Sequence, residues 1–417
     1  MNQVYQTDQS FREPLSASQG GTGALYSKLV TIQFALAILG YPVVGVLGSL
    51  LAPESSAGAV AYRASAVGLS IVMVGLSLWE RRASGRLDLT LAALLLVYSL
   101  RLLIDFYSGQ FPELGWNAAQ FYGFCVVPLL GVAVLSNFRS ADQDTKFMFI
   151  VGLLVCCLFT AMVLAGVSSV SLATEEFQGR VAVARLNPIS VGHMGASTII
   201  ASLAMIFEHR GGSRTKPFLF LAFAAALYCL FVAESRGPLL SLGVAVLALL
   251  AVKRRWKSMS FLFAIGFGYA LWSSNSGGGL FDRLREIGSD QSSLSRLDLQ
   301  SLAFSEFIQS PILGSAHVEL LTGGYSHNLL LDAAMSTGVI GLGLLVWLLI
   351  KLGGACVRLL RAGQLLLPLL AIQYTAAAQF SGSMFSSPEF WMCAALALSA
   401  ARGLRPVALS AEPLAQA

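Results

Sequence analysis

The chain has 417 residues, of which 56% are apolar and only 12% are Asp, Glu, Lys or Arg, and its mean hydropathy is +0.71. A soluble domain needs roughly twice that charged fraction to cover its surface. The composition therefore excludes a water-soluble protein, a disordered protein and a nucleic-acid module as descriptions of the whole. All six cysteines lie in apolar runs or beside inward loops, so no disulfide framework is indicated. The chain is predicted to be an integral membrane protein.

Residues 1–27 are polar and lack a cleavable signal pattern, so they are predicted to be a disordered tail. A helix needs about 20 mainly apolar residues to cross about 30 Å of hydrocarbon. The fold class predicted is all-α, a polytopic transmembrane bundle of about twelve spans. The expected spans are 29–52, 64–79, 87–107, 118–136, 147–170, 189–207, 216–233, 238–252, 259–272, 328–350, 364–381 and 388–401. This divides the chain into 1–27, spans one to nine (28–272), a long loop (273–327), spans ten to twelve (328–401) and a tail (402–417).

The distribution of Lys and Arg predicts the orientation of the spans. One alternate set of connections holds most of the basic residues, and positive residues are retained in the cytoplasm. Both termini are therefore expected in the cytoplasm. The remaining, outward arginines concentrate in the loop 171–188, the turn 234–237 and the loop 273–327. A long loop between spans usually carries function or is disordered.

Arg236 lies in a tight outward turn, Glu234-Ser235-Arg236-Gly237-Pro238. Pro238 suits the first turn of the next helix, where its missing N–H costs nothing. The turn holds the arginine at the outer boundary of the bundle. One interpretation is that Arg236 extends to lipid headgroups, which arginine does readily; the other is that it binds a ligand.

The long loop contains a predicted helix over 293–310, ended by Pro311. On an ideal helical wheel Arg296 and Gln300 fall on the apolar arc, and the opposite arc is polar. The apolar arc otherwise holds Leu297, Ala303, Phe304, Phe307 and Ile308. An amphipathic helix on the membrane surface explains the apolar residues. It does not explain Arg296, which favours a functional role because a buried guanidinium needs an anionic partner.

His327 ends the long loop, directly before a strongly apolar span that contains Asp332. A neutral imidazole at the outer rim can accept a proton near pH 7. Asp332 is an ionisable group within a span, hence a functional candidate that could orient His327. The alternative for His327 is an ordinary polar residue at the rim. Gly338 and Gly341 are expected to allow close helix packing.

Arg180 and Arg185 precede Asn187-Pro188 in an outward loop, where an ion pair with Glu175 or Glu176 is an equal alternative to ligand binding. His193 could be a hydrogen-bonded residue between packed helices. No Cys/His cluster has the spacing of a metal site, and no glycine-rich phosphate loop follows a strand.

Several arginines and one histidine thus gather at the outer mouth of an apolar bundle. Arginine matches phosphate oxygens bidentately and is always charged. A site that holds a diphosphate while its lipid tail lies between helices would use such residues. The histidine could then deprotonate a sugar hydroxyl while the guanidinium groups stabilise the leaving diphosphate.

The sequence resembles the O-antigen ligase and polymerase superfamily over roughly residues 180–350. The stretches that carry the resemblance are Ser235-Arg236-Gly237, then Ser295-Arg296-Leu297 through Pro311-Ile312-Leu313-Gly314, and His327-Asn328 through Gly338-Val339-Ile340-Gly341. Two positions depart from the family pattern: Ala316 stands where a glycine is frequent, and Ser336 where an acidic residue is frequent.

The resemblance implies a GT-C-like, metal-independent, inverting glycosyltransferase of the bacterial inner membrane with a periplasmic active site and no cofactor. Arg236 and Arg296 would bind the diphosphate, Arg185 would be a third phosphate ligand by position, and His327 would activate the acceptor hydroxyl. Asp332, Arg180 and Gln300 would support them. The donor would be an undecaprenyl-diphosphate-linked glycan, with a flippase and a chain-length regulator as protein partners and no nucleic acid.

Two questions stay open at this stage. Polymerase and ligase are not separated by these motifs; polymerase is favoured because nothing marks a lipid A-core acceptor. A twelve-span transporter or lipid-linked oligosaccharide flippase is the alternative, since an even span count suits it. Against it, the longest loop lies outside between spans nine and ten rather than inside between six and seven.

Overall fold

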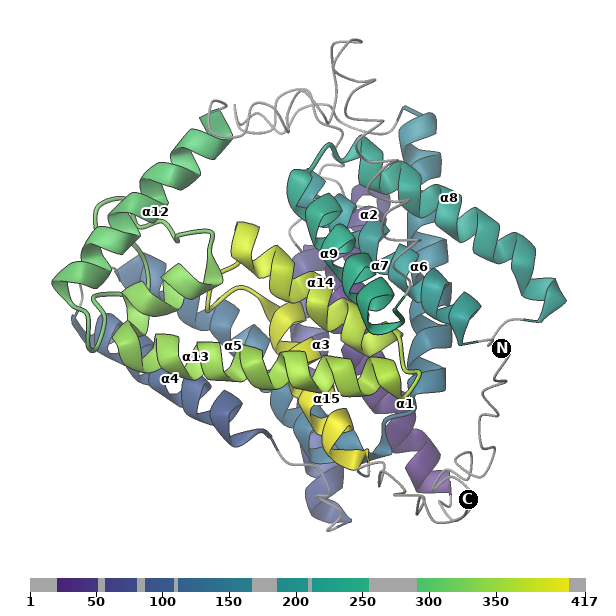
Figure 1. The fold of residues 1–417 in the computed structure, drawn as a ribbon, viewed down its shortest axis with the longest axis horizontal. Coiled ribbons are helices and arrows are strands. Elements are labelled where there is room, and N and C mark those ends of the chain that lie inside the picture. Colours follow the sequence, from purple (N-terminus) through teal and green to yellow (C-terminus); the bar gives the residue numbers. More distant parts are fainter. Residues whose placement is uncertain are drawn as a thin grey trace, which may run out of the picture.

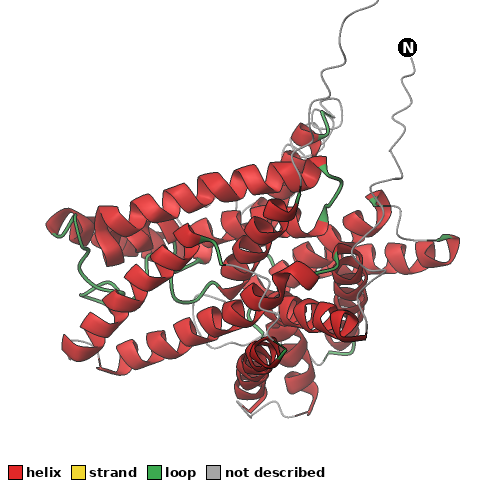
Figure 2. Cartoon of the chain, turned by 90° about the horizontal axis from the view of Figure 1, so that it is seen from below, coloured by secondary structure: helices red, strands yellow, loops and turns green. Residues whose placement is uncertain are grey.

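The computed structural model describes residues 21–51, 57–80, 87–108, 112–166, 186–208, 212–254 and 291–404. All elements in this part of the chain are helices joined by loops (Figures 1 and 2). They are α1 (Gly21–Ala35), η3 (Leu36–Gly40), α2 (Tyr41–Leu51), α3 (Ala57–Trp79), α4 (Leu89–Ser108), α5 (Pro112–Leu135), η4 (Ser136–Phe138), α6 (Ala141–Leu164), α7 (Pro188–Phe207), η6 (Ser213–Thr215), α8 (Lys216–Val232), α9 (Arg236–Val252), α12 (Gln291–Gln309), α13 (Leu329–Arg361), α14 (Leu366–Ser381) and α15 (Pro388–Gly403).

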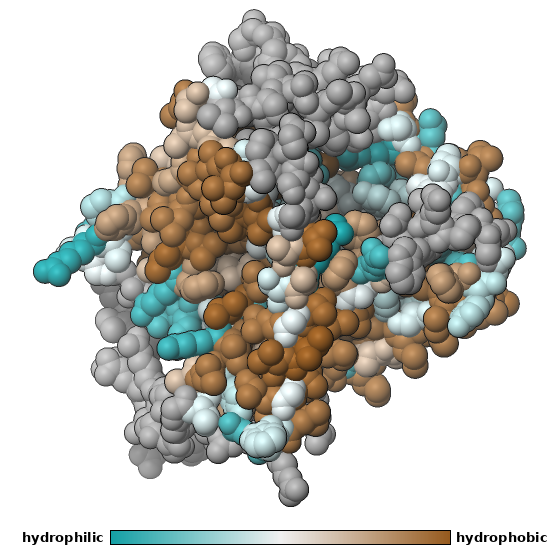
Figure 3. Space-filling model, turned by 180° about the vertical axis from the view of Figure 1, so that it is seen from behind, coloured by the Kyte–Doolittle hydropathy of each residue, from teal (hydrophilic) through white to brown (hydrophobic). Residues whose placement is uncertain are grey.

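The helical membrane bundle predicted from the sequence is confirmed. Among the described residues, eight helices are long and apolar enough to cross a membrane, and α1, η3 and α2 together form the first of them. Large apolar side chains remain exposed on the bundle, for example Leu78, Trp79 and Phe220, and apolar residues cover much of the face in Figure 3. Such a surface is costly in water but matches lipid tails.

Several predicted boundaries were wrong. Residues 21–27, predicted as part of a disordered tail, are the start of α1. The span predicted at 147–170 is α6 at 141–164, because Ser140 caps a polar first turn that hydropathy does not register. The predicted span 259–272 lies outside the described residues. The loop helix predicted at 293–310 is confirmed as α12.

The last two helices form the centre of the bundle. α14 and α15 have only 16 residues each, and in α15 the side chains from Phe390 to Leu398 are all buried. A helix that is apolar on every side is stable only where neighbours cover it; α15 packs against α5, α13 and α14 (Figure 1). Its first turn is thereby held inside the protein at the end where α14 finishes.

Candidate active site

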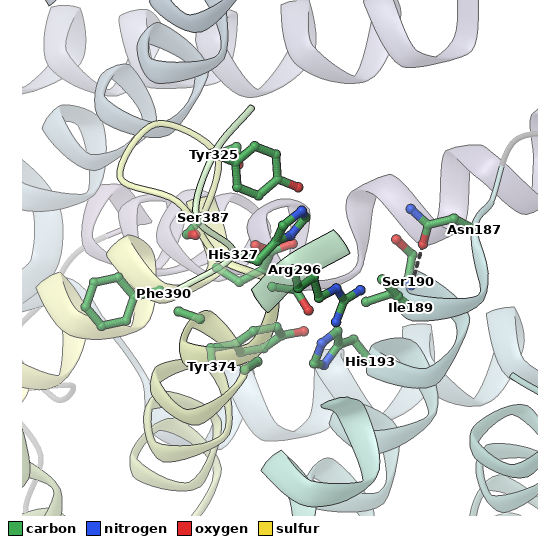
Figure 4. Close-up of a pocket in the computed structure, with 16 residues that line it drawn as sticks. Asn187, Ile189, Ser190, His193, Arg296, Tyr325, His327, Tyr374, Ser387 and Phe390 are labelled. Atoms are coloured by element: carbon green, nitrogen blue, oxygen red, sulfur yellow. Dashed lines mark hydrogen bonds between the residues drawn. The ribbon is translucent and has the colours of Figure 1, made fainter. Parts of the chain in front are cut away.

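A cavity of about 320 Å³ lies where several helix ends meet (Figure 4). Its walls are the first turns of α7 and α15, the last turns of α14, the loop 382–387, and the segment before α13. Arg296 enters it from α12. All of these ends belong to the set that the distribution of Lys and Arg predicts to face outward.

Arg296 and His327, far apart in sequence, line this cavity together. Nη1 of Arg296 donates to the carbonyl oxygen of Phe380 at 3.3 Å, which joins α12 to the end of α14. In Figure 4 the guanidinium lies between His327 on one side and His193 and Tyr374 on the other. The arginine is therefore presented to the cavity from a loop helix rather than from a span.

α12 is fixed by its protein-facing side, where Ala303 is fully buried. Glu306 on the same side accepts hydrogen bonds from the backbone N–H of Leu320 at 2.6 Å and from the hydroxyl of Ser315 at 2.7 Å. Phe304 and Ile308 remain exposed on the other side. Arg296 thus shares the protein-facing side of the helix and does not point with these two apolar side chains.

His327 is held in an unusual backbone conformation, with φ at +55°. The next residue, Asn328, caps α13: its side-chain oxygen accepts from the N–H of Leu331 at 3.0 Å, and its amide donates to the carbonyl of Gln379 at 3.2 Å. The ring of Tyr325 lies 4.2 Å from the imidazole, centroid to centroid. The histidine ring is therefore oriented by its backbone, the cap and an aromatic neighbour.

The electrostatic environment keeps His327 neutral. Burial lowers the pKa of the imidazole, and the positive charge of Arg296 lowers it further, to about 4. At pH 7 the ring is therefore uncharged and can accept a proton.

The motifs around Gly314 and Gly338 hold the loop against α13. The N–H of Val339 donates to the carbonyl of Pro311 at 2.8 Å, and α13 is kinked at Gly338 (φ 64°, ψ −161°). A Cβ atom on Gly338 would lie 2.2 Å from the oxygen of Ile312, and one on Gly314 would lie 2.4 Å from the backbone of Ser336. The helix packing expected at Gly338 and Gly341 was wrong: Gly338 lies against the loop backbone at Ile312, and Gly341 lies against the side chain of Thr337 on the same helix.

Asp332 is fully buried in α13, and its Oδ2 accepts from the N–H of Met384 at 2.7 Å. No hydrogen bond joins it to His327, both of which belong to the described residues, so the expected direct orientation of the histidine is not seen. Asp332 instead fixes the loop 382–387, which forms one wall of the cavity. Ser336, at the position where an acid is frequent, donates to the carbonyl of Asp332 at 2.6 Å.

The other predicted site residues fall into two groups. Arg236 is half-buried at the start of α9 and does not line the cavity, but its neighbour Gly237 packs beside Phe380 and Ser381 at the end of α14. Gln300 is half-buried on α12, also outside the lining. Arg180 and Arg185 lie outside the described residues.

The sequence analysis missed two residues of the cavity wall, Tyr374 and Glu389. Tyr374 is buried and shares a 2.9 Å hydrogen bond with Ser197, while its ring lies 5.6 Å from that of His193. Glu389 follows Pro388 in the first turn of α15. A carboxylate in the first turn of an outward-starting span is a signal in the sequence that could have identified Glu389.

A third missed residue, His317, anchors the loop from outside the cavity. Its backbone N–H and ring Nδ1 both contact Oδ2 of Asp105, at 2.7 and 2.8 Å. Asp105 also pairs with Arg101, one turn earlier on α4. This arginine inside the third predicted span therefore has a structural partner, and the network ties the segment before His327 to α4.

The described residues contain no group of three or more His, Cys, Asp or Glu side chains placed to hold a metal ion. The groups that line the cavity are a neutral imidazole, a guanidinium, a carboxylate and several hydroxyls. The guanidinium can bind an anionic group, and the imidazole can take a proton from a hydroxyl.

Comparison with known proteins finds a similar family for part of the chain. The family model described as O-antigen ligase matches residues 221–346, which include Arg236, Arg296, His327 and Asp332. No curated protein matches the chain. The match confirms the resemblance drawn from the sequence motifs over most of its extent. Residues 221–346 of this multi-pass membrane protein are therefore similar to the O-antigen ligase family, which supports the O-antigen ligase and polymerase superfamily.

Proposed function

We propose that the protein transfers a glycan from undecaprenyl diphosphate to an acceptor sugar at the periplasmic face of the bacterial inner membrane. The observation that carries the proposal is the shared cavity: Arg296 and His327 line it together, at helix ends predicted to face outward. The family match supports a ligase or polymerase type of membrane enzyme. The proposal is supported by a guanidinium, which can bind an anion, and a neutral imidazole, which can accept a proton, in the lining of one cavity.

The proposed reaction uses both the imidazole of His327 and the guanidinium of Arg296. The acceptor hydroxyl oxygen forms a bond to the anomeric carbon of the donor sugar, and the bond from that carbon to the phosphate oxygen breaks. The hydroxyl proton goes to His327, and the electron pair of the broken bond stays on the diphosphate beside Arg296. Attack opposite the leaving group inverts the anomeric configuration. The mechanism is proposed to proceed without a metal ion.

Arg236 is assigned to the same diphosphate. The turn before α9 lies beside the end of α14, whose Phe380 carbonyl accepts from Arg296. A diphosphate carries charge on both phosphate groups, and two guanidinium groups on adjoining elements suit it better than one. Arg185 is proposed as a third ligand from its position in the sequence, with Arg180 and Gln300 in support.

Purified protein, incubated with lipid-linked repeat units alone and with lipid A-core added separately, tests the function. Elongation of the lipid-linked repeats identifies a polymerase, which we favour; transfer to lipid A-core identifies a ligase. The His327→Ala variant should form no product in either reaction. Substrate flux across vesicle membranes without any new glycosidic bond would contradict the enzyme hypothesis and favour the transporter.

A further inference from the structure

The cavity contains one carboxylate that the proposed reaction does not use. Glu389 lines the cavity from the first turn of α15 and is half-buried. No salt bridge joins it to a cation in the part of the chain that the structure describes. A partly buried carboxylate without a cation loses hydration and gains little in exchange, unless a ligand supplies hydrogen-bond donors.

Charge divides the cavity into two regions. The donor diphosphate is an anion, and Arg296 marks where it binds. Glu389 would repel that diphosphate within a volume of about 320 Å³. The carboxylate therefore belongs to the part of the site that receives a neutral, hydroxyl-rich group, which donates hydrogen bonds and carries no charge.

The surroundings of Glu389 suit such a group. Ser386 and Ser387 on the adjoining loop offer hydroxyls, and the rings of Tyr374 and Phe390 offer flat apolar faces. Sites for small polar ligands combine apolar walls with a few placed polar groups. Tyr374 is held in place by Ser197, which also accepts a hydrogen bond from Gln373 at 3.3 Å. The wall is therefore built before any ligand arrives.

We propose that Glu389 and Tyr374 form the acceptor-sugar subsite, with the carboxylate accepting hydrogen bonds from hydroxyls of the sugar that is to be glycosylated. The inference rests on the proposed function and adds where the acceptor lies: on the α15 side of the cavity, across from Arg296. Glu389 would hold the acceptor so that its attacking hydroxyl faces His327.

A purely structural role is the competing explanation, because a carboxylate in the first turn of a helix is stabilised by the helix dipole. Asp142 provides the matched control. It lies in the first turn of α6, is half exposed, and is absent from the cavity. Asp142→Asn also removes a first-turn carboxylate without touching the cavity, but Asp142, unlike Glu389, pairs with a cation, Lys146, at 2.9 Å.

The test compares Glu389→Gln, Asp142→Asn and the wild type as full-length purified proteins. Steady-state kinetics use the acceptor that the wild type extends, and equilibrium binding uses undecaprenyl diphosphate as the probe. For Glu389→Gln we expect the KM for the acceptor to rise at least tenfold and the Kd for undecaprenyl diphosphate to stay within twofold. Asp142→Asn should change neither, and Tyr374→Phe, which keeps the ring, should remain closer to wild type than Tyr374→Ala.

Two results would overturn the inference. One is an unchanged acceptor KM in a well-folded Glu389→Gln variant; the other is a weakened Kd for undecaprenyl diphosphate, which would place Glu389 in the donor region. A wild type that forms no glycosidic bond with either acceptor would instead remove the proposed function and this subsite together. Melting temperatures of all variants separate loss of fold from loss of acceptor binding.

Discussion

The guanidinium of Arg296 and the imidazole of His327 line one cavity, and the positive charge of the arginine contributes to the low pKa of the histidine. The residue assigned to the donor and the residue assigned to the acceptor proton are thus electrostatically coupled. When a diphosphate neutralises Arg296, the pKa of His327 should rise, which makes the imidazole a stronger base only after the donor has bound.

This coupling predicts a difference between two pH profiles. His327 must be neutral to act, so activity falls as the pH drops through its pKa. The acid limb of kcat/KM for the donor, which reports the free enzyme, should lie near pH 4, and that of kcat should lie at higher pH. Initial rates from pH 3.5 to 8 at varied donor concentration measure both. Coincident limbs near pH 6.5 would mean that the two groups are not coupled.

Loss of the His327 imidazole or of the Arg296 guanidinium should stop polysaccharide synthesis. We expect His327→Ala and Arg296→Ala, expressed at the normal level, to abolish long-chain polysaccharide on a gel. Arg296→Lys should retain at most about one part in a hundred of the transfer rate, because lysine loses the bidentate geometry that stabilises the leaving diphosphate. Arg361→Ala, at the opposite end of α13, is the control and should leave chain length unchanged. Full-length chains from either alanine variant would remove that residue from the site.

The kink in α13 predicts a large and local effect on stability. Gly338→Ala should destabilise the protein by more than about 2 kcal/mol, because the φ and ψ of Gly338 are nearly exclusive to glycine and a Cβ would meet the carbonyl of Ile312. Gly343→Ala on the same helix meets nothing within 4 Å and should be neutral or stabilising. Thermal melts in the same detergent compare them, and equal melting temperatures would argue against the docked kink.

The cap of α13 should matter more for activity than for stability. Asn328→Ala loses the hydrogen bond to Leu331 N–H, worth about 1 kcal/mol, and releases the backbone that holds His327. We expect the transfer rate to fall about tenfold or more. Asn328→Asp keeps the acceptor that caps α13 but loses the donor to the Gln379 carbonyl, so its melting temperature should fall below that of the wild type. A normal rate in the alanine variant would show that the cap does not position the histidine.

The proposed side of the membrane can be tested directly. In a cysteine-free background, Ser305→Cys on the exposed side of α12 should react with a membrane-impermeant maleimide added from the periplasm. Ser213→Cys, exposed in η6 between α7 and α8, should react only after the cells are opened. If Ser213→Cys reacted from the periplasm and Ser305→Cys only in opened cells, the cavity would face the cytosol. That result would contradict a periplasmic active site.

Local sequence patterns predict the membrane spans, their orientation and the end of α12. Apolar runs of helical length predict the spans, the bias of Lys and Arg predicts their orientation, and Pro311 marks the end of α12. The spans and their orientation depend on the free energy of placing backbone polar groups and charges in lipid. This free energy is set by each segment's own residues. Arg296 could be singled out because it lies on the apolar arc of its helix, and His327 because it stands at the outer end of a span.

Only the tertiary structure decided which side chains share a cavity. Glu389 joins Arg296 because α15 is buried among its neighbours and its first turn meets the end of α14, which hydropathy cannot distinguish from a lipid-facing span. Tyr374 joins them from α14. Asp332 likewise binds Met384 instead of His327, since a buried carboxylate takes whichever donor the neighbouring loop presents. Contacts between elements distant in the chain depend on packing, and no local pattern encodes them.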